Sequence, residues 1–187
     1  MSNKKTNPQR IPASISEVEA RKLIEVESDK MLLYSWAIVL CALAGWQETT
    51  ADDLLEFCEN VNRKSSKLRT ARDVRTSLGN LEALTGRSFP FYNLVIEGLH
   101  SKKDIERLKK RARISAMHSM FALIADSVTV HQIMEEDRLR SLFLKVHSIE
   151  KAMMDGEISF RDLLWVLEEE YALQITVQGT EVILSAI

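Results

Sequence analysis

Two stretches of this sequence concentrate basic side chains, the residue type that could bind phosphate groups or acidic protein surfaces. Arg63–Arg75 holds six lysines and arginines against one acid, and Lys102–Arg113 holds seven against two. We take these residues as the candidates for contact with a partner or a nucleic acid. The candidate residues are Arg63, Lys64, Lys67, Arg69, Arg72, Arg75, Lys102, Lys103, Lys109, Lys110, Arg111 and Arg113.

The first basic stretch lies between two short predicted helices and continues onto the second. A helix-turn-helix protein presents its recognition helix in this position, and a hairpin after that helix would make the motif winged. Phosphate contacts from these residues would give binding that weakens with salt. The connection Val61–Thr70 is longer than a tight helix-turn-helix turn. A solvated loop and an exposed helix face therefore remain an alternative interpretation.

Other chemistry has little support in the residue pattern. No HExxH, GxxxxGK[ST], GxGxxG or GxSxG motif occurs, and only six glycines are present. His131 and Glu135 would share a helix face, but nothing nearby in sequence completes a metal site. The acidic runs stand at helix starts or on polar faces, where solvated carboxylates are common. We expect no enzyme activity, no cofactor and no metal.

Composition favours an intracellular protein without a membrane segment. The formal net charge is −2, so any electrostatic function depends on local patches. Cys41 and Cys58 lie on apolar helical faces, which predicts buried thiols and a reducing, cytoplasmic location. The uncharged run Met31–Gln47 is shorter than the roughly 20 residues that span a bilayer. We expect it to be a buried helix.

Capping signals and glycines predict mainly helical structure. A hydroxyl residue stands three positions before an acid at Ser16, Thr50, Thr70, Ser101 and Ser159, and each pair can bond the free N–H groups of a first helical turn. Glycines that follow apolar-periodic segments mark helix ends. The predicted helices cover residues 15–45, 51–63, 71–85, 102–129, 135–155 and 160–172.

The tail "LQITVQGTEVILSAI" has two β-prone runs around a Gln-Gly pair, which predicts a small hairpin. Residues 1–13 are polar and hold two of the three prolines, which is typical of a flexible arm. The expected fold is a bundle of about six to seven helices with a C-terminal β-hairpin.

The two halves of the chain show signs of an internal repeat. "RDVRTSLGNLEAL" and "RDLLWVLEEEYAL" share five of thirteen residues. The preceding helices "DDLLEFCENV" and "DRLRSLFLKV" have apolar residues at the same spacing of 0, 3, 4 and 7. We expect repeat units at 14–100 and 101–187, each of three helices and a hairpin, with a shared core. Chance similarity between amphipathic helices is the alternative.

The second unit also carries a family resemblance. Asp155-Gly156-Glu157-Ile158-Ser159 is followed by "FRDLLWVLEEEY" and a short apolar strand. With this ending, the segment 138–176 resembles small helical proteins of unassigned function encoded by phages and prophages of Gram-positive bacteria. The resemblance implies an accessory phage protein and carries over no activity.

Together these features favour a non-enzymatic regulatory or inhibitory module that acts by protein–protein contact. A phage-encoded inhibitor of a host system is one concrete form of it, and a homodimer is compatible with a scaffold that has one basic and one acidic face. The alternative is a winged-helix-like nucleic-acid binder that uses residues 63–75 and 102–113.

Overall fold

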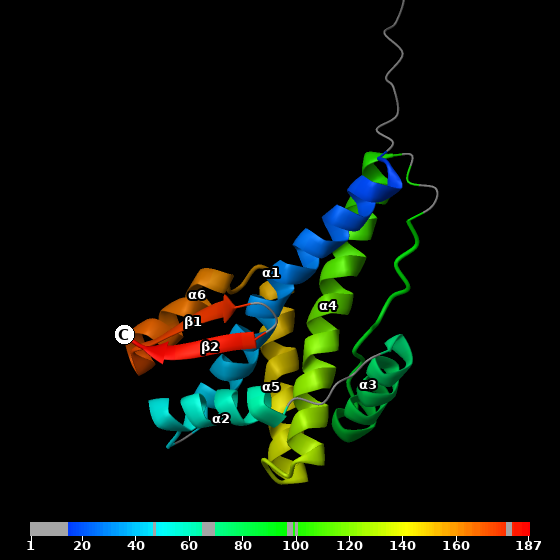
Figure 1. Cartoon of the computed structure of the whole chain (residues 1–187). Coiled ribbons are helices and arrows are strands. Elements are labelled where there is room, and N and C mark those ends of the chain that lie inside the picture. Colours follow the sequence, from blue (N-terminus) through cyan, green and yellow to red (C-terminus); the bar gives the residue numbers. More distant parts are fainter. Residues whose placement is uncertain (1–14, 47, 65–69, 97–98, 100, 179–180) are drawn as a thin grey trace, which may run out of the picture.

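The computed structural model describes residues 15–46, 48–64, 70–96, 99, 101–178 and 181–187, and within them the chain forms a helical bundle with one small sheet (Figure 1). A π-helical turn, Val166–Glu170, follows the last helix. The helices are α1 (Glu17–Ala44), α2 (Ala51–Lys64), α3 (Ala71–Thr85), α4 (Lys102–Val130), α5 (Glu136–Met154) and α6 (Phe160–Trp165), and the strands are β1 (Leu173–Gln178) and β2 (Glu181–Ala186).

Local sequence accounts for where these helices begin. At α1, α3 and α6 the cap hydroxyl accepts a hydrogen bond from the third backbone N–H of the helix, and the acid at that position bonds back to the cap N–H. Thr50 and Asp53 form the same reciprocal pair before α2. Ser101 caps α4 through the N–H of Asp104. All five predicted helix starts are therefore confirmed.

Glycines end two of the helices by adopting a left-handed backbone. Gly86 has φ 66° and donates its N–H to the carbonyl of Glu82, while Gly156 has φ 75° just after α5. A side chain is strained at such a φ, so glycine fits both positions.

One apolar core joins all the helices, and α1 and α4 form its central pair. The uncharged run predicted as a buried helix is the C-terminal half of α1, where Trp36 and Leu40 are fully enclosed. No helix in the described ranges has both the length and the apolar character needed to cross a membrane.

The predicted C-terminal hairpin is confirmed. β1 and β2 pair antiparallel, with Ile175 opposite Leu184 and Thr176 opposite Ile183. Asn62 of α2 donates a 2.6 Å hydrogen bond to the carbonyl of Val182, so α2 covers part of the outer edge of β2.

The first helix of each predicted unit packs on helices of the other predicted unit. α1 packs against α5 and α6, while α4 packs against α2 and α3. The apolar positions predicted at matching spacing in α2 and α5 are all buried. This exchange is what two units with a shared core would produce, although descent from a duplication stays a prediction.

The hairpin expected after the first unit is absent from the described residues. Residues 87–96 contain no strand. Pro90 interrupts this segment, and its backbone bonds to side chains, since Phe89 N–H donates to Glu82 and Tyr92 N–H to Ser115. Phe89 enters the core and lies edge-on to Phe121 at a centroid distance of 6.4 Å.

Two details of the prediction differ from the structure. α4 ends at Val130, within one residue of the prediction, and residues 131–135 are not helical, so His131 and Glu135 do not share a helix face as a metal site built on their spacing would require. The helix predicted over 160–172 changes into the π-helical turn after Trp165.

Candidate partner-binding surfaces

Arg63, near the end of α2, is exposed to solvent. Arg63 lies 3.6 Å from Glu59 one turn earlier, and both side chains are mostly exposed, so this ion pair adds little to stability. Lys64 is the last residue of α2. The candidates Lys67 and Arg69 lie outside the described residues.

Arg72 and Arg75 lie exposed on the first turns of α3. The guanidinium of Arg75 donates a hydrogen bond to the side-chain carbonyl of Asn93 and lies 5.3 Å from the ring centre of Phe91. These contacts hold Arg75 against the irregular segment that follows α3.

The second basic stretch forms the N-terminal half of α4. Lys102 and Lys103 are exposed on its first turn. Lys109 pairs with Glu106 at 3.0 Å, whereas Lys110 is exposed and lines a groove described below.

Arg111 and Arg75 lie around the same short segment although they come from different basic stretches. The guanidinium of Arg111 lies 5.5 Å from the ring centre of Tyr92, and Arg75 lies over the adjacent Phe91. The structure therefore brings part of each stretch together around two neighbouring aromatic residues. We call Arg75, Phe91, Tyr92, Asn93 and Arg111 the arginine–aromatic surface.

This surface is not a winged helix-turn-helix. α2 packs on β2, while α3 packs on α4 and α5, and Figure 1 shows α2 and α3 well separated. The described residues after α3 contain no wing strand. Although both helices touch α4, α2 also packs on β2 and α3 on α5, so α2 and α3 do not form the paired helices of that motif.

Arg113, the last candidate of the second stretch, bridges α4 to α1 by a hydrogen-bonded ion pair with Glu27. The Glu27 side chain is only 7% exposed, and its contact with the Arg113 guanidinium lowers the pKa of the carboxyl group. Arg113 is therefore engaged in an intramolecular ion pair, which makes its guanidinium less available to a partner than that of an unpaired arginine.

A methionine-rich groove opens between α1, α4 and the C-terminal end of α5. We call it the methionine groove; its volume is about 380 Å³. Four of the seven methionines of the chain line it, together with the aromatic ring of Tyr34. Methionine side chains are flexible and polarisable, so such a lining adapts to differently shaped apolar groups. The groove is lined by Met31, Tyr34, Ile38, Lys110, Arg113, Ile114, Met117, Glu150, Met153 and Met154.

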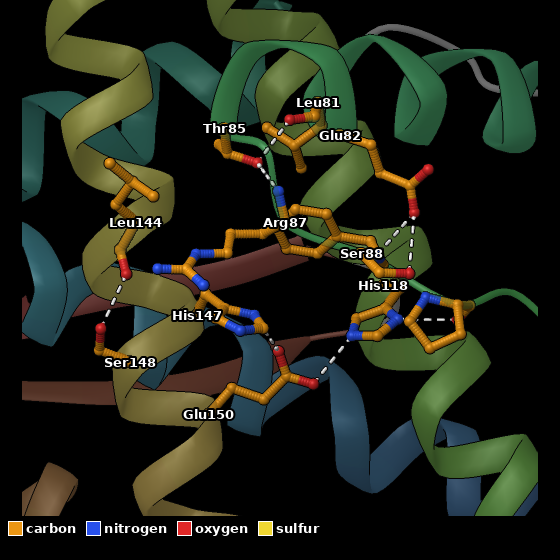
Figure 2. Close-up of polar contacts among 12 residues, drawn as sticks. Leu81, Glu82, Thr85, Arg87, Ser88, His118, Leu144, His147, Ser148 and Glu150 are labelled. Atoms are coloured by element: carbon orange, nitrogen blue, oxygen red, sulfur yellow. Dashed lines mark hydrogen bonds and ion pairs between the residues drawn. The ribbon is translucent and has the colours of Figure 1, made fainter.

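A buried polar cluster lies behind this groove, and Figure 2 shows Glu150 between two histidines. Glu150 Oε1 is 2.8 Å from His118 Nε2, and the other ring nitrogen of His118 is 2.8 Å from the carbonyl oxygen of Pro90. His147 Nδ1 lies 3.9 Å from Glu150 Oε2. Both His118 and Glu150 are at least 95% buried.

The hydrogen bonds of His118 show which of its ring nitrogens carries a hydrogen. A carbonyl oxygen only accepts, so Nδ1 of His118 carries the hydrogen that it donates to Pro90. The contact between Nε2 and Glu150 then requires a second proton, on the ring or on the carboxyl group. The cluster ties α4, α5 and the segment after α3 together, which is a structural role.

Sequence reasoning did not find this pair, because His118 and Glu150 are 32 residues apart and belong to no local motif. The only signal was helical spacing, which predicts that both lie on inward faces of their helices.

Cys58 is buried and Cys41 is partly buried, and neither is in a disulfide. Burial raises the pKa of the Cys41 thiol to about 12 and that of Cys58 to about 11. In the part of the chain that is described, no three His, Cys, Asp or Glu side chains come together as metal ligands.

Comparison with protein-family models, with curated proteins and with solved structures finds no match for this chain. The functional argument therefore rests on the residues and their geometry.

Proposed function

We propose that this protein is a non-enzymatic regulatory or inhibitory module that acts by binding another protein. The methionine groove carries the proposal. Its lining is mainly apolar, and Met154 at its edge is 57% exposed. An exposed apolar surface that is rimmed by polar residues is typical of a site of protein–protein contact.

The proposal includes a cytoplasmic location and a phage origin. Both cysteines are free, which fits a reducing compartment. The resemblance of residues 138–176 to phage-encoded helical proteins implies only the phage origin; that the partner is a component of a host system is part of the proposal.

Site-specific photo-crosslinking tests the proposal. A benzophenone amino acid replaces Met154 in the groove or, as the control, Arg140, which is exposed nearer the start of α5. The expected result in a bacterial host lysate is one protein adduct from position 154 and none from position 140. Equal labelling from both positions, or no adduct from either, contradicts the proposal.

If the adduct forms, the activity of the captured host component is then measured with and without this protein. Loss of that activity supports inhibition, and an unchanged activity contradicts it.

Nucleic-acid binding is the second candidate, and the arginine–aromatic surface favours it. Arginines beside aromatic rings suit both phosphate contact and base stacking. Electrophoretic mobility shifts with duplex DNA and single-stranded RNA at rising salt test this function. Here Arg75→Glu and Arg111→Glu are expected to abolish a salt-sensitive shift that Arg140→Glu leaves intact. The absence of any shift near physiological salt contradicts this candidate.

A further inference from the structure

The N-terminal halves of α1 and α4 extend past the end of α5 (Figure 1). α1 and α4 have 28 and 29 residues, whereas α5 has 19, and Figure 1 shows both longer helices extending past the end of α5. A second apolar cluster, in which Leu94 and Ile96 of the segment after α3 pack on Ala20 and Leu108, covers one side of this extension. The methionine groove lies where α5 stops.

The position of the groove allows one more helix to pack between α1 and α4. Met153 and Met154 form its lower end at the last turn of α5, and the Glu27–Arg113 pair lies beside its upper part. Its walls are α1 and α4, and α5 packs against both of these helices in the neighbouring part of the bundle. A partner helix in the groove would extend the three-helix packing by one or two turns, as in other helix-in-groove complexes.

The charged groups around the groove are predominantly basic. Two basic residues line it, and of these Arg113 pairs with Glu27 while Lys110 has no ion-pair partner in the described residues. The two acids at the groove are already engaged, Glu27 with Arg113 and Glu150 with His118. The unmatched charge is therefore positive, which favours an acidic partner.

From these observations we propose that the methionine groove binds an acidic amphipathic helix of another protein, with apolar side chains among the methionines and carboxylates facing Lys110. The inference rests on the proposed protein-binding function and names the kind of partner. It requires no bound cofactor and no movement of the core, since the groove is already open.

Fluorescence anisotropy with designed peptides tests this inference. The probe is a labelled 18-residue helical peptide with leucines at positions i, i+3, i+4 and i+7 and glutamates on the flanks of that stripe. A second peptide has lysine in place of each glutamate, and a third has serine in place of each leucine. Only the glutamate–leucine peptide is expected to bind the full-length protein, and added salt is expected to weaken the binding.

Substitutions at the rim of the groove locate the binding. Lys110→Glu and Met154→Asp, both at exposed positions, are expected to weaken the glutamate–leucine peptide by about tenfold or more. The control Arg140→Glu reverses a charge of the same sign on α5 away from the groove and is expected to leave the affinity unchanged. Circular dichroism confirms that each variant folds.

Three results would overturn the inference: equal binding of the lysine peptide, no binding of any peptide, or saturable binding of dodecanoate alone. The last result would assign the groove to small amphiphiles. If position 154 still cross-links to a host protein while the acidic peptide fails to bind, the inference is wrong and the proposed function stands. If neither occurs, both fail.

Discussion

The hydrogen bond between His118 and Glu150 lies inside the core, where removing one partner leaves the other buried without compensation. We expect His118→Ala and Glu150→Ala each to lower the free energy of unfolding by about 3 kcal/mol. Urea unfolding followed by circular dichroism measures both changes.

The double variant provides the check on this prediction. Because each single change leaves the other member of the pair buried without its partner and the double change removes both members, the loss in the double variant is expected to be clearly smaller than the sum. His131→Ala, at an exposed position, is the control and should stay within about 0.5 kcal/mol of the unmodified protein. Additive losses would show that the pair contributes nothing as a pair.

The two thiols provide a second prediction at the residue scale. Burial holds the pKa of both cysteines at about 11 or above, so at pH 8 about one thiol in a thousand or fewer is ionised. We expect slow reaction of the folded protein with 5,5′-dithiobis(2-nitrobenzoate) and rapid reaction of two thiols per chain in urea. Absorbance of the released thiolate measures both rates, and fast labelling of the folded protein would contradict the burial of these groups.

At the scale of the element, the reciprocal caps explain why the helices begin where they do. Thr70 and Ser159 each accept a hydrogen bond from the backbone N–H three residues on. Replacing either residue by alanine removes this acceptor, so that the N–H group in the first turn can bond only to water. We expect Thr70→Ala and Ser159→Ala each to cost about 1 kcal/mol in the free energy of unfolding.

Thr76 is the matched control for this prediction. It lies on the exposed face of α3, and its hydroxyl bonds back to the carbonyl of Arg72 inside the helix. Alanine has the higher helix propensity, so Thr76→Ala should be neutral or slightly stabilising. Thermal unfolding compares the variants, and equal effects at Thr70 and Thr76 would contradict the role of the cap.

At the scale of the whole molecule, the hairpin depends on its contact with the helices. Val182 and Ile183 are neighbours in β2, but Val182 is fully buried and Ile183 is 41% exposed. We expect Val182→Asp to lower the free energy of unfolding by about 3 kcal/mol or more, since it buries a charge, and Ile183→Asp to have little effect. Urea unfolding distinguishes the two; similar losses at both positions would mean that the hairpin does not dock as described.

Local chemistry determined most of the elements from the sequence alone. A cap pairs residues three apart and a glycine stop acts within one turn, so neither depends on the rest of the chain. The five capped helix starts and the C-terminal hairpin are therefore confirmed from local signals. The repeat argument failed at residues 87–96, where the hairpin expected at the end of the first unit does not form. In this segment the backbone N–H groups of Phe89 and Tyr92 donate to the side chains of Glu82 in α3 and Ser115 in α4. The side chain of Phe89 is buried in the core.

The candidate sites depended on contacts that the sequence does not display. Arg75 and Arg111 belong to separate basic stretches, and only the path of the segment after α3 brings both to neighbouring rings. The methionine groove exists because α5 is shorter than the two helices it packs on, so residues from three distant helices meet at its end. The sequence by itself thus determined the helices, their caps and the distribution of charge, because these follow from short-range spacing. Only the tertiary structure decided which faces are buried together and which stay open, because packing joins residues far apart in the chain.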